Sequence, residues 1–223
     1  MREKPTVVLT ISRQLGSGGS YIGQAVASRF GMRYADREIL KQAAEAVGLR
    51  EGDLVVREEK AGGFWEGVLQ SFSLGTPEAA FVPPPLTPVY AEDLFKLESL
   101  IIREIADRFD AVIVGRGGFH VLAGRPNVAN VRVHADLDLR VRRVMEVYGI
   151  DNRRDAEESI RRSDRQRAQF IKSFTGQDWN DARVFDLCVN VGSVGLDAAT
   201  EIVASLAESM LGRRWTGAGG GPA

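Results

Sequence analysis

The sequence predicts an α/β fold, in which a parallel five-stranded sheet carries helices on both faces. Short apolar runs alternate with segments of helical periodicity along the chain. The runs are apolar at nearly every position, which is typical of parallel strands covered on both faces. A glycine-dense turn joins the first run to the first helix, as in loops that bind phosphate. Right-handed crossovers then place the ligand outside the carboxyl ends of the strands.

Composition narrows the class of protein. The 223 residues include 29 Lys and Arg against 30 Asp and Glu, so we expect no extended nucleic-acid footprint. The arginines do crowd between Arg132 and Arg167, which indicates a local anion site. No apolar run approaches the roughly 20 residues that a membrane span needs. A single cysteine, Cys188, excludes an internal disulfide and favours a cytoplasmic protein. Because Cys188 lies in an apolar run, we expect it to be buried.

The first strand is predicted at residues 6–12 and the first helix at 20–30. Between them lies a loop that approaches the P-loop motif G-x-x-x-x-G-K-[ST]. If Gly18 is the last glycine of the motif, Gly19 stands at the lysine position and Arg13 at the position of the first glycine. We expect the loop to bind phosphate, with Arg13 in place of the lysine. The alternative is a tight structural turn.

The middle of the chain is less regular. A strand is expected at residues 32–35, and Asp36 is placed to cap a helix that ends at Gly48. A second, charged helix is expected at 53–61. Residues 62–90 hold five of the eight prolines and keep neither helical nor strand period. We interpret them as a partly ordered insertion, near the site or at a subunit contact.

Regular patterns return in the second half. The expected elements are a helix at 91–109, strands at 111–114 and 128–133, a helix from Asp136 to Gly149, a charged helix at 151–172, a strand at 186–191, a helix at 197–211 followed by Gly212, and a flexible tail at 213–223.

Six segments, taken in order, resemble the cytidylate kinase-like family of P-loop nucleoside monophosphate kinases. They are ISRQLGSGGS (11–20), YADRE (34–38), VGRGG (114–118), VRVHA (131–135), SDRQR (163–167) and DWND (178–181). The resemblance implies one P-loop kinase-like domain over residues 1–212, with an arginine-rich helical lid at 151–172.

The resemblance also implies a reaction: transfer of the ATP γ-phosphoryl group to CMP, dCMP or a related small acceptor, with Mg²⁺. It implies cofactor-binding residues Gly16, Ser17, Gly18, Gly19 and Ser20, with Ser20 as the metal ligand. The implied catalytic residues are Arg13, Arg116, Arg162 (or Arg161) and Arg167, and the substrate-binding residues are Asp36, Arg116 and Asp164. Gly117 stands where cytidylate kinases have an aspartate.

Each site has a structural alternative. Arg116 could be a surface arginine in a turn, and the lid arginines could pair with acidic residues of their own helix. Of Arg140, Arg142 and Arg143, at least two are expected on a charged helix face, and one could reach the site. His134 is expected to be structural, and the segment 178–181 is expected to be a turn with a core tryptophan rather than a base contact.

Two functions remain open. The first is the kinase, with a small-molecule nucleotide substrate and no nucleic-acid or membrane partner. The second is a nucleotide-binding regulatory or interaction protein that keeps the fold without phosphoryl transfer, favoured by the missing loop lysine and the proline-rich insertion. The sequence leaves open whether two copies form a homodimer.

Overall fold

The structure, a computed structural model, describes residues 5–36 and 88–216. In this part of the chain, parallel strands form one five-stranded sheet in the order β2-β3-β1-β4-β5. The strands are β1 (Val8–Arg13), β2 (Arg33–Ala35), β3 (Ala111–Val114), β4 (Val128–His134) and β5 (Leu187–Asn190). The predicted fold class is confirmed.

Strand β1 is central, and all six of its residues are buried. It pairs with β3 on one side, where Ile11 lies opposite Val114, and with β4 on the other, where Arg13 lies opposite Val133. Because the strands are parallel, their carboxyl ends meet at one edge of the sheet. The turns that follow β1, β3 and β4 therefore lie side by side.

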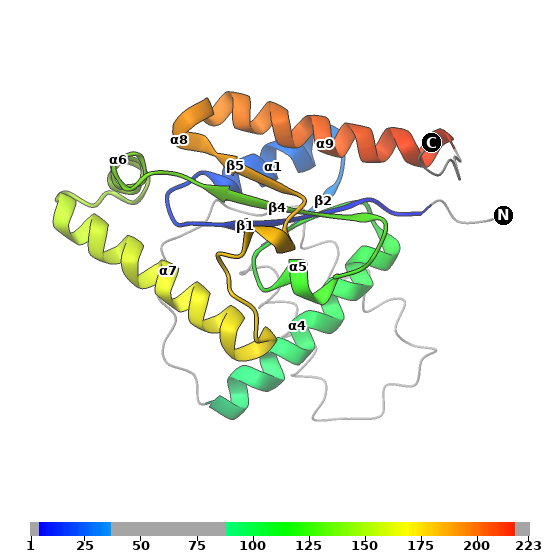
Figure 1. Cartoon of the computed structure of the whole chain (residues 1–223), viewed down its shortest axis with the longest axis horizontal. Coiled ribbons are helices and arrows are strands. Elements are labelled where there is room, and N and C mark those ends of the chain that lie inside the picture. The colour runs from blue at the N-terminus through cyan, green and yellow to red at the C-terminus, as the bar shows by residue number, and fades with distance from the viewer. Residues whose placement is uncertain (1–4, 37–87, 217–223) are drawn as a thin grey trace.

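Helices cover both faces of the sheet (Figure 1). Helices α1 (Gly19–Phe30), α8 (Val191–Val194) and α9 (Leu196–Thr216) lie on one face. Helices α4 (Pro88–Arg108) and α5 (Gly118–Val121) lie on the other. No helix in the described part of the chain is long and apolar enough to cross a membrane.

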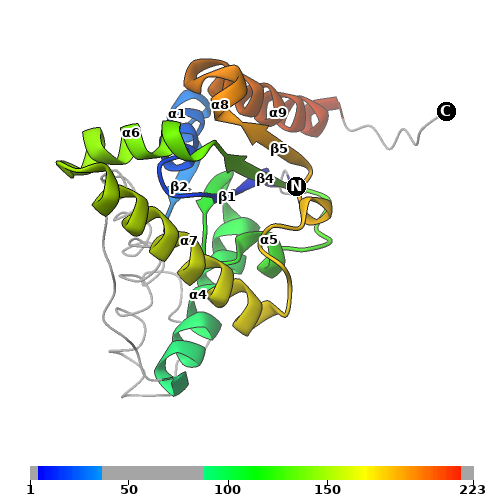
Figure 2. The ribbon, with the colours of Figure 1, turned by 60° about the vertical axis from the view of Figure 1, so that its left-hand side comes forward.

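Helix α6 (Leu137–Tyr148) follows β4, and α7 (Arg153–Thr175) runs from α6 down to α4 (Figure 2). As predicted, the Asp136 side chain caps α6 and Gly149 ends it in the left-handed conformation. Three aromatic rings join α7 to α4: Phe95 of α4 packs on Phe170 and Phe174, with ring centroids 5.5 and 4.8 Å apart. The carboxyl half of α7 thus packs on α4, which covers the face of the sheet opposite α1 (Figure 1).

Two predicted boundaries are wrong. Helix α4 begins at Pro88, inside the segment assigned to the insertion, because proline at the first helical position loses no helical hydrogen bond. Helix α9 continues through Gly212 to Thr216, beyond the predicted helix end at residue 211, because a helical glycine costs only about 1 kcal/mol. The helices predicted within 36–61, the rest of the insertion and the tail from 217 lie outside the described residues.

Candidate active site

The glycine loop connects β1 to α1 at the carboxyl edge of the sheet. Gly16 and Gly18 adopt positive φ angles of 78° and 86°. Gly18 is the N-cap of α1, and no side chain caps that helix terminus. Helices α6 and α7, by contrast, are capped by Asp136 and Asn152. No side chain therefore caps the first N–H groups of α1, which is the condition for an anion to bind there.

Helix α6 packs directly against this loop. A Cβ atom on Gly16 would lie 2.7 Å from the carbonyl oxygen of Arg140, and one on Gly18 would lie 2.5 Å from Nη1 of Arg143. Arg143 Nη1 is buried and has no hydrogen-bond partner among the described residues. Arg142, on the same helix, is exposed. Of the three arginines of α6, the structure thus brings two to the loop and directs one to solvent.

Arg140 and helix α7 hold the loop in place. Arg140 Nε donates to the Leu15 carbonyl oxygen (2.7 Å), and its guanidinium forms an ion pair with Asp164. Asp164 Oδ1 accepts from the Leu15 N–H (3.2 Å), and Arg167 Nη1 donates to the Arg13 carbonyl oxygen (3.2 Å). Asp164 and Arg167, on the helix that the sequence predicts to be a lid, thus bind the backbone of the glycine loop.

The side chain of Arg13 passes between α1 and the end of β3. A Cβ atom on Gly19 would overlap Arg13 Cβ and lie 2.9 Å from Arg13 Cγ, and one on Gly115 would overlap Arg13 Nη1. Gly115 also has a positive φ of 85°. The guanidinium of Arg13 therefore reaches the turn after β3, across the carboxyl edge of the sheet. The glycine at the usual lysine position makes room for the arginine at the usual glycine position.

Arg116 lies in the same turn and is held by two other elements. It has a φ of 51°, a left-handed conformation that is rare for a residue with a side chain. It forms an ion pair with Glu98 of α4, whose side chain is only 1% exposed. Its guanidinium also stacks on Phe170 of α7, 4.2 Å from the ring centroid. Arg116 is therefore a fixed group rather than a solvated surface arginine.

The remaining predicted site residues differ in how far they are buried. Ser17 is fully buried, and its hydroxyl donates to the Gln14 carbonyl oxygen (2.8 Å), so it shapes the loop from inside. Ser20 is buried in the first turn of α1, and Asp36 is buried directly after β2. Arg162 is exposed on α7. The structure gathers the predicted residues of the loop and strand ends, but Arg162 is turned to solvent.

The expectation for Trp179 is confirmed, whereas that for Cys188 is wrong. Trp179 is buried, and its Nε1 donates to Ser12 Oγ (2.8 Å), so this segment packs on the sheet. Cys188 is exposed, because it lies on β5 at the edge of the sheet. An apolar run predicts burial only where layers cover both faces of the strand.

Sequence reasoning missed Glu98. A signal was present: this charged residue falls four positions after Leu94 and three before Ile101, on the apolar stripe of the predicted helix. A charge on a buried stripe calls for a partner, and Arg116 is that partner.

The parallel sheet and the glycine loop together define the fold of the P-loop kinases. A sequence model of the cytidylate kinase-like family matches residues 8–193, and the chain belongs to this family. A cytidylate kinase from Ignicoccus hospitalis is 27% identical over 197 residues, which cover 88% of this chain and 96% of that one. A crystal structure of an uncharacterized protein from Eubacterium ventriosum is similar, with a TM-score of 0.67 and 21% identity over 92% of this chain and 99% of that one.

Proposed function

We propose that the protein is a phosphotransferase that moves the γ-phosphoryl group of ATP to CMP, dCMP or a related small acceptor. The observation that carries this proposal is the contact between Arg143 and the glycine loop. A buried guanidinium nitrogen lies against Gly18, where α1 begins without a side-chain cap. Phosphoryl transfer depends on fixed positive charge around the transferring phosphate, and this arrangement supplies it.

Arg143 is suited to the ATP phosphates because its charge is not already neutralised. In the part of the chain that the structure describes, it forms no ion pair, whereas Arg140 is paired with Asp164. A triphosphate on the loop would meet the N–H groups of α1 and the guanidinium of Arg143 together. Arg13 would approach the same phosphates from the β3 side, where its guanidinium lies beside Gly115.

Ser20 fits the role of magnesium ligand. Its hydroxyl belongs to the second residue of α1, directly after the loop. Mg²⁺ is bound by one or two protein oxygens and completes its coordination with phosphate oxygens and water, so a single hydroxyl is an adequate protein contribution. The ion would neutralise charge on the ATP phosphates.

The acceptor would bind at the ends of β2 and β3. Arg116 follows β3 and Asp36 follows β2, and these strands are neighbours in the sheet. Arg116 uses Nε and Nη2 toward Glu98, which leaves Nη1 of its fork to meet an acceptor phosphate. Glu98 would fix the direction of that fork.

The test is a coupled assay for ADP production with a panel of nucleoside monophosphates, together with calorimetric titration of ATP. Arg143→Met should weaken ATP binding about tenfold or more, since a charge-assisted hydrogen bond contributes roughly 1.5–3 kcal/mol. Arg142→Met is the matched control, because it removes the same charge from the exposed face of the same helix and should change the affinity less than twofold. Equal effects of the two variants would remove Arg143 from the site.

One observation favours the second function, a nucleotide-binding regulatory protein without phosphoryl transfer. Arg116, the arginine assigned to the acceptor, is already engaged by the buried Glu98 carboxylate. Tight ATP binding without turnover on any acceptor in the panel would support this alternative and refute the kinase.

A further inference from the structure

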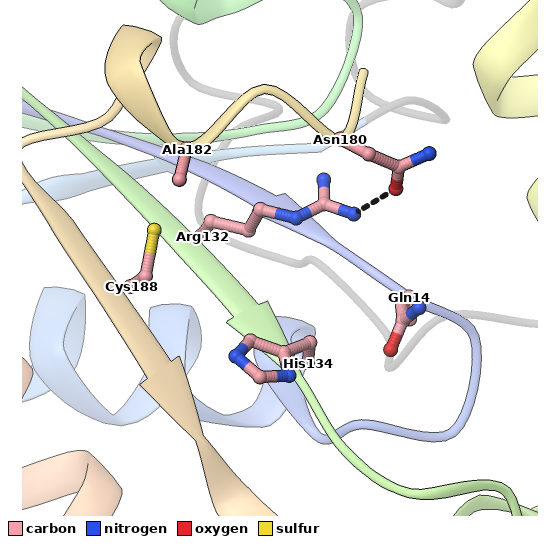
Figure 3. A pocket seen from close by; sticks show the side chains of 6 residues that line it. All are labelled: Gln14, Arg132, His134, Asn180, Ala182 and Cys188. Carbon is pink, nitrogen blue, oxygen red and sulfur yellow. Dashed lines mark hydrogen bonds between the residues drawn. The ribbon is translucent and has the colours of Figure 1, made fainter. Parts of the chain in front are cut away.

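A cavity with both polar and apolar lining lies beside the glycine loop, on the face of the sheet opposite α1 (Figure 3). Its volume is about 290 Å³, just below the range of about 300–1,000 Å³ for drug-sized ligands, so it suits a smaller ligand. The cavity is lined by Gln14, Arg132, His134, Asn180, Ala182 and Cys188. Arg132 and Cys188 are cross-strand partners on β4 and β5, so their side chains share this face.

Arg132 is the central group of the cavity. Its side chain is buried, with the residue 6% exposed, and its hydrogen bonds go to neutral oxygens. Nη1 donates to the Trp179 carbonyl oxygen and Nη2 to Asn180 Oδ1, both at 2.7 Å. The guanidinium stacks on the Trp179 ring, 4.4 Å from its centroid. These contacts orient the cation without neutralising it.

No carboxylate forms an ion pair with Arg132 among the described residues, although the charges of Asp164 and Asp178 act on it from farther away. Burial lowers the pKa of Arg132, although an arginine remains protonated. A buried cation without a counter-ion is costly, and proteins compensate such charges with an opposite charge. The cavity next to the guanidinium is where that opposite charge can enter.

The other polar groups of the cavity are also suited to an anion. Gln14 Oε1 accepts from the Ala135 N–H (3.2 Å), which directs its amide NH₂ elsewhere. His134 ends β4, and burial and the charge of Arg132 lower the pKa of its imidazole. The neutral ring still has one N–H to donate. The guanidinium of Arg132 and the imidazole of His134 thus bring two donors from β4, and Gln14 lines the cavity from the loop after β1, while the oxygen of Asn180 is already used by Arg132.

We propose that this cavity binds a small oxyanion, a phosphate or a carboxylate group, with Arg132 as its counter-charge. The cavity and the helix α1 lie on opposite faces of the sheet (Figure 3), and this proposal does not depend on the proposed kinase activity. Gln14 belongs to both the loop and the cavity wall, so the bound anion would touch the back of the loop.

Cys188 makes the cavity directly measurable. It is the single cysteine of the chain and is exposed at the cavity. The test compares its alkylation by iodoacetate, an anion, with alkylation by neutral iodoacetamide, followed by intact mass at constant ionic strength. Both reagents need the same thiolate, so the ratio of their rates reports the local charge alone.

The ratio of iodoacetate to iodoacetamide rates should fall about three- to tenfold in Arg132→Met. Arg183→Met is the matched control: Arg183 follows Ala182 of the cavity wall, is exposed and pairs with Asp181, so its loss should leave the ratio unchanged. If Arg132→Met does not fold, protection of Cys188 from alkylation in the wild-type protein tests the proposal instead. Millimolar inorganic phosphate or acetate should then slow both alkylations, and the more effective of the two identifies the preferred anion.

Three results would overturn the proposal. The first is an unchanged rate ratio in folded Arg132→Met. The second is the absence of protection by both phosphate and acetate in the wild type. The third is protection that disappears in Arg143→Met but persists in Arg132→Met, because the anion would then act at the glycine loop.

Discussion

Replacing Gly19 with alanine should destabilise the protein, although alanine is the better helix former. Gly19 is the first residue of α1, and an added Cβ would overlap Arg13 Cβ and lie 2.9 Å from its Cγ and 3.3 Å from Val133 Cβ. The Arg13 Cβ is attached to the buried backbone of the central strand, so it cannot move aside as the end of a long side chain could. The overlap must be relieved by shifting the loop.

The expected net loss is about 1–2 kcal/mol in the free energy of unfolding. Overpacking of a rigid site costs about 1–3 kcal/mol. The higher helix propensity of alanine returns at most about 1 kcal/mol, and less at a first helical position. The matched control is Gly212→Ala in α9, where nothing lies within 4 Å of the added Cβ. This variant should gain up to about 1 kcal/mol.

Urea denaturation of the three proteins, with a common slope, measures the difference. Gly19→Ala as stable as the wild type would refute the reasoning. A double-mutant cycle makes the test sharper. Gly19→Lys alone restores the motif lysine and should destabilise strongly, whereas Arg13→Gly/Gly19→Lys should recover about 1–2 kcal/mol of coupling. The missing lysine and the extra arginine would then be one coupled substitution.

Three further predictions concern the surrounding contacts. Glu98→Gln leaves Arg116 without its buried counter-charge and should cost about 3 kcal/mol in unfolding free energy; a cost under about 1 kcal/mol would contradict the pairing. Trp179→Phe removes the donor to Ser12 Oγ and should cost about 1–2 kcal/mol by thermal denaturation, while an unchanged Tm argues against that bond. Burial, together with the charge of the neighbouring arginine, lowers the pKa of His134 below its usual 6.5, so the unfolded state takes up the proton first. The stability advantage of wild type over His134→Asn should therefore shrink as the pH falls below about 6.5, and parallel stability curves would refute this.

Local patterns were sufficient for the elements of the fold. The strand at β1, the cap of α6 at Asp136 and its end at Gly149 follow from apolar periodicity and from capping chemistry. These features depend on residues within one turn or one strand of each other. The glycine loop was recognisable for the same reason, since its order of strand, glycines and helix is contiguous in the sequence.

The arrangement of the site was decided by contacts between distant segments. The sequence left three arginines of α6 equivalent, and only packing against Gly18 distinguishes Arg143 from Arg142. The pairing of Arg116 with Glu98 likewise joins the end of β3 to α4. The apolar stripe marks Glu98 as a charge that needs a partner, but no local pattern names either partner, because each contact depends on how the helices lie over the sheet.

The sequence by itself determined that a glycine loop follows the first strand of this α/β fold and that arginines gather near it. Tertiary structure decided which arginines face the loop, which are neutralised and which, like Arg132, keep a buried charge. The physical reason is that a side chain's charge is fixed by its chemistry, whereas its counter-charge is supplied by whichever distant segment the parallel sheet brings beside it.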